Sequence, residues 1–158
     1  MNYLNLDKKK TASTAKELNI LLADYHLYYQ KLRNFHWNIV GNHFFNLHIK
    51  FEEMYDDAKL KIDEIAERIL TLGFTPLHSF SDYIKNSDVK ETVGISDGVR
   101  AVETILHDFK ILILKERELL KLSAEANDEG TGALMSDYIR EQEKTVWMYN
   151  SFLGKKSS

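Results

Sequence analysis

Apolar side chains recur at three- and four-residue steps along most of the chain, which is the period of an amphipathic α-helix. A first helix is expected to begin near Ser13 or Thr14, either of which is suited to cap it, and to end at the sequence VGN at 40–42. Its apolar stripe consists of Ile20, Leu21, Tyr25, Tyr28, Leu32 and Phe35. The long segments show this helical period rather than the strict alternation of a strand, so the pattern predicts an all-α protein.

Three more long helices follow from the same pattern. A second runs from about Phe44 to Leu72, where Gly73 is a suitable C-terminal cap and Pro76 lies just beyond it. A third opens at Ser96 or Asp97 and runs to about Ala126. The fourth follows the sequence NDEGTG and ends at Phe152 or Leu153, before Gly154.

The connection between the second and third helices, residues 74–95, is unusually long for a helical bundle. It is mostly polar, and SFSDYIKN within it is able to form a short helix. Such a connection indicates a crossover that carries the chain to the other end of the molecule. The sequence therefore predicts one ferritin-like four-helix bundle over residues 1–158, with short flexible tails at about 1–12 and 154–158.

Composition excludes several classes of protein. The chain contains no cysteine, which rules out disulfides and thiolate metal sites and fits a reducing compartment such as the cytoplasm. It has no secretory signal pattern at its start and no window of about eighteen apolar residues, so we expect no membrane span. Its net charge of −3 does not indicate a nucleic-acid partner.

Two polar pairs lie on one face of the second predicted helix. His48 and Glu52 are four residues apart, and so are Asp63 and Glu67, so that each pair is able to share an ion. The eleven residues from Glu52 to Asp63 keep the pairs on one face but separate them by roughly 16 Å along the axis. That separation is far greater than a metal–ligand distance of about 2 Å, so one ion cannot hold both pairs of one chain.

A second copy of this helix, antiparallel across a two-fold axis, resolves the geometry. Each His48–Glu52 pair then faces the Asp63–Glu67 pair of the other copy, which creates two identical sites. His36, near the end of the first helix, is placed to add a second imidazole to the His48 half. Two histidines and three carboxylates suit Fe(II), Mn(II) or Zn(II) better than Cu(I). The prediction is a metal site shared between subunits.

Plainer interpretations exist for each residue alone. Acidic side chains on a helix are usually solvated, and His48 alone is also typical of a hydrogen-bonded interface histidine. The remaining histidines have no comparable partners and are interpreted as structural or surface residues: His26, His43, His78 and His107. The chain contains no Glu-x-x-His motif, the ligand pattern of a di-iron site in the centre of a bundle. An iron site, if present, is therefore not expected at the bundle centre.

The segment LRNFHWNIVGNHFFNLHIKFEEMYDDAKLKIDEIAERIL at 32–70 resembles the signature of the Dps family, the mini-ferritins known as DNA-binding proteins from starved cells. The shared pattern is His-Trp, then Phe-Phe-x-Leu-His, then Asp-Glu-x-Ala-Glu-Arg. The segment from NDEGT to NSFL is similar, more weakly, to the last helix of that family. Only the two ends of the chain fall outside the resemblance.

This resemblance implies a ferroxidase centre between subunits of a hollow dodecamer built from two-fold dimers, in the bacterial cytoplasm. Carried over by position, one half-site is His36, His48 and Glu52, and the other is Asp63 and Glu67. The family often has Asp at the position of Glu52. Trp37 matches a tryptophan thought to trap oxidising equivalents, although an aromatic packing role fits the local sequence equally well. Family members oxidise Fe(II), usually with hydrogen peroxide, and store a ferric mineral.

Two further family properties depend on residues that this chain lacks or has only in part. Ala133 stands where the last helix often carries an Asp near the pore for iron, and Asp137 or Glu141 are weak substitutes. Some members bind DNA through a lysine-rich tail, matched here by two short clusters: Lys8, Lys9 and Lys10, and Lys155 and Lys156. Their brevity and the negative net charge favour solvated tails. A DNA-compacting protein with a vestigial or structural metal site is the alternative, and a plain helical interaction module is the third.

Overall fold

The computed structural model describes residues 3–155, and every regular element within that range is a helix. Four long helices are present: α1 (Lys8–Asn38), α2 (Phe44–Thr71), α4 (Gly98–Ala126) and α5 (Glu129–Phe152). A short helix, α3 (Phe80–Asn86), lies in the crossover between α2 and α4. The predicted fold class and the short crossover helix are both confirmed.

Three of the four long helices begin at an aspartate whose side chain accepts from N–H groups of the first turn, whereas α2 has no side-chain cap. Asp97 caps α4 by accepting from Arg100 N, and Asp128 caps α5 by accepting from Thr131 N. At its other end α4 finishes with Asn127 in the left-handed conformation (φ 54°), a frequent helix stop. The start and end of α4 agree with the prediction, whereas α5 begins at Glu129, inside the NDEGTG sequence that it was expected to follow.

The predicted start of the first helix was wrong. Asp7, not Ser13 or Thr14, is the N-cap of α1, and its carboxylate accepts from the N–H groups of Lys9 and Lys10. Thr14 instead lies inside the helix and is fully buried. Residues 8–12, expected in a flexible tail, therefore form the first turns of α1.

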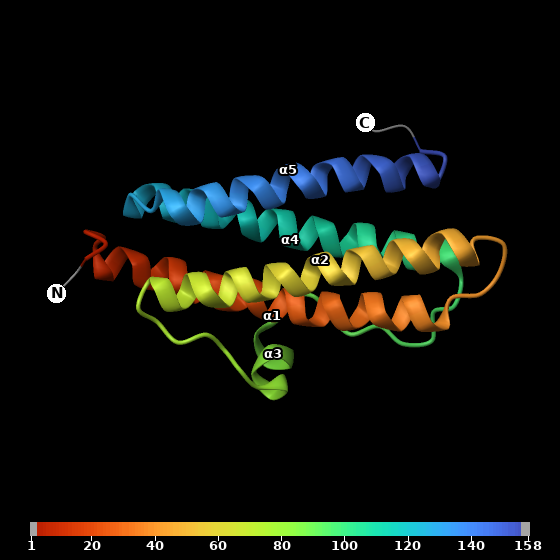
Figure 1. Ribbon diagram of the computed structural model, residues 1–158, viewed down its shortest axis with the longest axis horizontal. Coiled ribbons are helices and arrows are strands. Elements are labelled where there is room, and N and C mark those ends of the chain that lie inside the picture. Colours follow the sequence, from red (N-terminus) through yellow and green to blue (C-terminus); the bar gives the residue numbers. More distant parts are fainter. Residues whose placement is uncertain (1–2, 156–158) are drawn as a thin grey trace.

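The four long helices run side by side as an up-down-down-up bundle (Figure 1). α1 packs against α2 and α4, and α4 packs against α5. The crossover starts at the end of α2 and includes α3, which packs beside α1. It ends at the opposite end of the bundle, where α4 begins. There Val40 N donates to Ser96 O (3.0 Å), which joins the loop after α1 to the start of α4.

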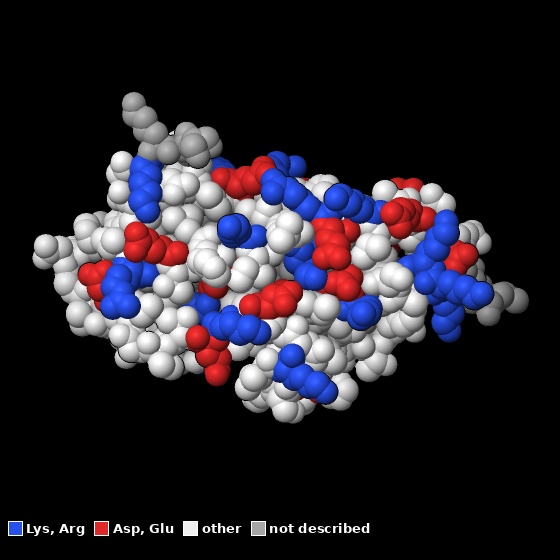
Figure 2. Space-filling view, turned by 180° about the vertical axis from the view of Figure 1, so that it is seen from behind, with Lys and Arg blue, Asp and Glu red and all other residues white. Residues whose placement is uncertain are grey.

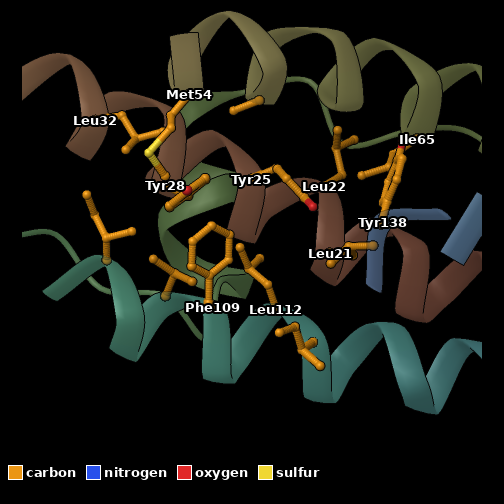
Figure 3. Packing of buried hydrophobic residues seen from close by; sticks show 14 of the residues in the cluster. Leu21, Leu22, Tyr25, Tyr28, Leu32, Met54, Ile65, Phe109, Leu112 and Tyr138 are labelled. Carbon is orange, nitrogen blue, oxygen red and sulfur yellow. The ribbon is translucent and has the colours of Figure 1, made fainter. Parts of the chain in front are cut away.

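The core lies between the four long helices and is rich in aromatic side chains. Tyr28, Met54 and Phe109 come from α1, α2 and α4 and point toward one another (Figure 3). Leucine and isoleucine side chains complete it, several of them fully inaccessible to solvent: Leu18, Leu21, Leu32, Ile65, Ile105 and Leu112. α2 and α5, in contrast, approach each other at few points, and a pocket lies between them.

Candidate metal centre

The end of α1 and the start of α2 bring His36 and His48 into direct contact. Their rings stack with centroids 3.8 Å apart and an interplanar angle of 18°. Phe44, one turn before His48, stacks on that ring with centroids 5.0 Å apart. His36 is buried and His48 half-buried, so the surrounding packing fixes both rings. The structure thus brings together the two histidines that sequence reasoning placed in one half-site.

Each histidine is held by the backbone carbonyl of the other. His36 Nδ1 lies 2.7 Å from His48 O, and His48 Nδ1 lies 2.7 Å from His36 O. A carbonyl oxygen only accepts, so both Nδ1 atoms carry a hydrogen, and this tautomer leaves Nε2 as the nitrogen available to a metal. Histidine ligands in metal sites are commonly oriented in this way, through a hydrogen bond from the other ring nitrogen. The pair therefore offers two oriented nitrogen donors.

Glu52 lies one turn beyond His48 on an exposed stretch of α2. Tyr55 OH is 3.3 Å from Glu52 Oε1, and the Tyr55 ring meets the His36 ring edge-on with centroids 5.4 Å apart. Burial and the neighbouring Glu52 carboxylate raise the pKa of the Tyr55 hydroxyl, which keeps it a donor. Tyr55 was not predicted as part of this half-site, although it lies one turn after Glu52 on the same helix.

Trp37 is adjacent to this half-site but largely outside the packing. Its side chain is 55% exposed, and the guanidinium of Arg33, one turn earlier on α1, lies 4.7 Å from its ring centroid. Arg33 also lies 5.4 Å from the ring of Tyr29, which in turn contacts Tyr55. A purely core-filling role for Trp37 does not fit this exposure. A cation–π contact of this kind is worth about 0.5–1 kcal/mol at an exposed site.

Asp63 and Glu67 lie further along α2, and both are exposed. Neither carboxylate forms an ion pair within residues 3–155. In that part of the chain no three histidine or acidic side chains converge on a common point that would hold a metal ion. One subunit thus presents a nitrogen-rich half and a separate carboxylate half, and the assignment of all five residues to a shared site stays a prediction.

A second polar cluster lies in the bundle core, away from the histidines. Glu116 Oε1 accepts from Tyr25 OH (2.9 Å) and from Gln142 Nε2 (2.6 Å). Burial raises the pKa of Glu116 from 4.5 to about 8. The cluster contains a single carboxyl and no histidine, so it offers too few donors for a di-iron site of the bundle-centre type.

The surface carries both signs of charge without a large region of one sign on the face shown in Figure 2. Lys8, Lys9 and Lys10 are exposed in the first turn of α1, and Lys155 lies 3.5 Å from Glu103. Lys156, the other member of that predicted cluster, lies outside the described residues. Within the described part of the chain, no helix is long and apolar enough to cross a membrane.

Comparison with known proteins identifies the class. The family model described as Ferritin-like domain matches residues 15–157. A "DNA protection during starvation protein" of Porphyromonas gingivalis is 43% identical over 155 residues, covering 98% of this chain and 98% of the relative. The chain is thus a ferritin-like four-helix bundle protein.

Solved structures narrow the class to a family. A Dps protein from Vibrio cholerae O1, described as a member of a broad superfamily of ferritin-like diiron-carboxylate proteins, superposes with a TM-score of 0.94 at 51% identity, covering 97% of this chain and 96% of the other. A Dps protein from Bacillus brevis gives a TM-score of 0.89 at 34% identity, with coverages of 92% and 97%. The chain belongs to the Dps family, which confirms the resemblance seen in its sequence.

Proposed function

We propose that this protein is a ferroxidase and iron-storage mini-ferritin of the bacterial cytoplasm. In this proposal twelve copies form a hollow shell, and pairs of copies related by two-fold axes build the iron-oxidising sites between them. The proposal is supported by membership of the Dps family and by the likeness to a protein described as diiron-carboxylate. The protein would remove Fe(II) and hydrogen peroxide together and store the ferric product as a mineral.

The observation that carries this proposal is the reciprocal hydrogen bonding of His36 and His48. It occupies both Nδ1 atoms and leaves both Nε2 atoms free to bind a metal ion. Glu52 extends that half-site with a carboxylate, and Asp63 and Glu67 of the other subunit supply the second half. Nitrogen and carboxylate donors hold Fe(II) as an exchangeable substrate, and the negative charge of the carboxylates stabilises Fe(III). Zn(II) or Mn(II) would bind the same donors as substitutes.

The proposed reaction transfers two electrons. Each of two Fe(II) ions gives one electron to a hydrogen peroxide molecule, which takes up two protons and becomes two water molecules. Because both electrons go to one peroxide, no hydroxyl radical is released. Trp37 is proposed to trap oxidising equivalents that escape this pairing, since its exposed ring lies next to His36.

We propose that protection of DNA follows from this chemistry rather than from a coat of protein on DNA. Lys8, Lys9 and Lys10 lie in a helical turn, where Lys9 and Lys10 N–H groups are bound to Asp7, and do not form a free basic tail. The net charge of −3 per chain opposes attraction to phosphate. Nonspecific DNA binding remains the second candidate because avidity multiplies weak contacts in a shell.

The test is Fe(II) oxidation by hydrogen peroxide in the His36→Ala plus Asp63→Ala variant. Loss of one nitrogen and one carboxylate donor from each composite site is expected to slow oxidation by at least about 10²-fold. A matched control, His78→Ala plus Glu125→Ala, removes one imidazole and one carboxylate elsewhere on the surface and is expected to oxidise at the wild-type rate. Unchanged kinetics in the first variant would remove the site assignment.

The same proteins distinguish iron oxidation from the second candidate function, nonspecific DNA binding. Wild-type protein is expected to form a soluble ferric core and to leave the mobility of linear DNA unchanged at physiological salt. A DNA mobility shift in the His36→Ala plus Asp63→Ala variant, together with no oxidation by wild-type protein, would favour the DNA-binding function instead.

A further inference from the structure

Two oxygen atoms in the centre of the bundle have no hydrogen-bond partner. Glu116 Oε2 on α4 and Gln142 Oε1 on α5 are both inaccessible to solvent, and neither has a partner within residues 3–155. They belong to side chains that already touch, because Gln142 Nε2 lies 2.6 Å from Glu116 Oε1. Buried polar atoms normally have partners, so these two oxygens need an explanation from within the core.

The planar shapes of the two groups supply that explanation. A protonated carboxyl and a carboxamide are able to face each other with two parallel hydrogen bonds. The amide N–H donates to one carboxyl oxygen, and the carboxyl O–H donates to the amide oxygen. The first bond is the observed contact between Gln142 Nε2 and Glu116 Oε1, and a proton on Glu116 Oε2 supplies the second. That second bond joins the two oxygens that have no other partner.

An ionised Glu116 does not satisfy the same atoms. Its Oε2 and Gln142 Oε1 would both only accept, so they could not pair with each other. Turning the amide over places its oxygen 2.6 Å from Glu116 Oε1, and two oxygens at that distance again require a proton between them. Tyr25 OH donates to Glu116 Oε1 (2.9 Å) and leaves Oε2 without a donor.

Among the described residues, no cation near Glu116 is free to hold it in the ionised form. The titratable groups that act on it come from all four long helices: Tyr25 and Tyr28 of α1, Lys61 of α2, Arg117 of α4 and Tyr138 of α5. Lys61 and Arg117 are each already paired with carboxylates of α2 or α5. Burial therefore dominates and raises the pKa of Glu116 to about 8.

We propose that Glu116 and Gln142 form this closed acid–amide pair, and that the pair is a proton-operated latch between α4 and α5. With the proton in place, two hydrogen bonds join the helices. Without it, two acceptors face each other in an apolar interior, which is unfavourable. The latch is separate from the proposed iron chemistry, because neither side chain belongs to the proposed metal site.

The latch holds most tightly in acid. In the closed bundle Glu116 keeps its proton up to about pH 8, whereas a carboxyl exposed to water by opening loses it above about pH 4.5. Closure is therefore fully favoured below about pH 4.5, becomes about tenfold less favoured for each pH unit above that value, and levels off above about pH 8. Acidification thus tightens the contact between α4 and α5.

The first test is amide hydrogen exchange of the α5 segment around Gln142, in the assembled protein, from about pH 5.5 to pH 7.5. Glu116→Gln keeps both hydrogen bonds without a titrating group, and comparison at equal pH cancels the intrinsic exchange rate. The ratio of wild-type to variant exchange is expected to rise about tenfold per pH unit. Glu118→Gln, an exposed acid paired with Lys115, is expected to follow wild type. A ratio that does not change with pH overturns the latch.

Infrared spectroscopy tests the pairing itself. The carbonyl band of protonated Glu116 is the carboxylic acid band that is missing from Glu116→Gln. Gln142→Leu removes both bonds of the pair, so this band is expected to move to higher frequency, whereas Gln30→Leu, at an exposed position of α1, leaves it in place. Absence of the band from wild type, or an unmoved band in Gln142→Leu, contradicts the pairing.

An exchanged variant gives a check that does not depend on the folding of Gln142→Leu. Glu116→Gln plus Gln142→Glu again places one acid opposite one amide. It is expected to recover the acid band and the pH dependence of α5 exchange that Glu116→Gln alone lacks. An ionised carboxyl at position 142 in this variant would overturn the proposal that the pair holds the proton.

Discussion

Glu116 places a carboxyl group in the apolar centre of the bundle, where its side chain is fully inaccessible to solvent. The sequence indicates this burial, because Glu116 lies between Leu112 and Leu119 on the buried stripe of α4. An acid at such a position is either paired or protonated. The sequence could not say which, because the partners Tyr25 and Gln142 come from two other helices.

Glu116 is expected to make the folded state less stable as pH rises. Its pKa is about 8 in the fold against an ordinary value of 4.5, so between these values the folded carboxyl keeps a proton that the unfolded one has lost. The free energy of unfolding therefore falls from about pH 4.5 and levels off above about pH 8, by up to about 5 kcal/mol. Glu116→Gln, which cannot ionise, is expected to remove this dependence.

The measurement is the denaturant midpoint of wild-type and Glu116→Gln protein from pH 5 to pH 9 at one protein concentration. The stability of the variant relative to wild type is expected to increase as pH rises, so that the variant is clearly more stable at pH 9. Glu118→Gln, a neighbouring exposed acid paired with Lys115, is the matched control and is expected to follow wild type. Parallel curves for wild type and Glu116→Gln would mean that the buried carboxyl is ionised in the fold.

The histidine pair shows what residue patterns can and cannot predict. The spacing of His48 and Glu52 placed them on one face of α2, and the short loop after α1 brought His36 close. The stacked rings and the exchanged carbonyl bonds depend on how that loop closes, so no sequence pattern predicted them. Tyr55 was missed because a tyrosine on the core side of a helix is as typical of a packing residue as of a residue at a binding site.

At the scale of elements, the helix ends followed local chemistry closely. The start of α4 and the end of α2 were predicted, because each lies at a capping Asp or a Gly with little competition nearby. The start of α5 was placed after NDEGTG, but the helix begins within that sequence, at Glu129, because Asp128 caps it. The start of α1 was misplaced because Asp7, Ser13 and Thr14 are all able to cap a helix. Burial of Thr14 by the crossing helices decided among them, and that is a tertiary effect.

The cap of α5 also ties that helix to the end of α2. Asp128 is fully buried; it accepts from Thr131 N and forms an ion pair with Arg68 of α2 at 2.5 Å. Thr131 Oγ1 donates to Asp128 Oδ2 (2.6 Å) and accepts from Arg68 Nε (2.9 Å). One carboxylate thus satisfies the first turn of α5 and a cation of another helix.

Asp128→Ala is therefore expected to destabilise the fold by about 2–4 kcal/mol, because it removes a helix cap and leaves Arg68 without its ion-pair partner. Asp128→Asn keeps one acceptor oxygen for the cap but removes the charge and replaces the second acceptor with an NH2 group, so a loss of about 1–2 kcal/mol is expected. Denaturant unfolding at fixed protein concentration measures both. Equal losses in the two variants would assign the whole effect to the ion pair. Asp137→Ala, an exposed acid on α5, is the control.

At the scale of the whole molecule, the bundle and its crossover could be predicted from the sequence. Helical period, four long segments and one long polar connection allow few other topologies. The crossover is held by Asp24, whose carboxylate accepts from Asp88 N, Val89 N and Ser87 Oγ. That anchor was not predicted, because an acid on α1 and a loop more than sixty residues later carry no shared pattern.

The arrangement of subunits is the part of the proposed function that one chain cannot supply. His36 and Asp63 belong to opposite halves of the proposed site, so in a two-fold dimer each site takes one residue from each chain. Consider a dimer that combines one His36→Ala chain with one Asp63→Ala chain. One of its two sites then lacks both residues, and the other has wild-type residues throughout.

Mixing the two inactive variants is therefore expected to restore oxidation. When equal amounts are unfolded together and reassembled at random, half of the dimers are mixed, and about one quarter of all sites are intact. The peroxide-dependent oxidation rate should rise to about one quarter of the wild-type rate, whereas each variant reassembled alone stays inactive. A site built within one chain predicts no recovery, because every chain then carries a defect. Equal recovery from mixing His36→Ala with His48→Ala, which damage the same half-site, would also contradict the composite geometry, since that pairing leaves every site defective.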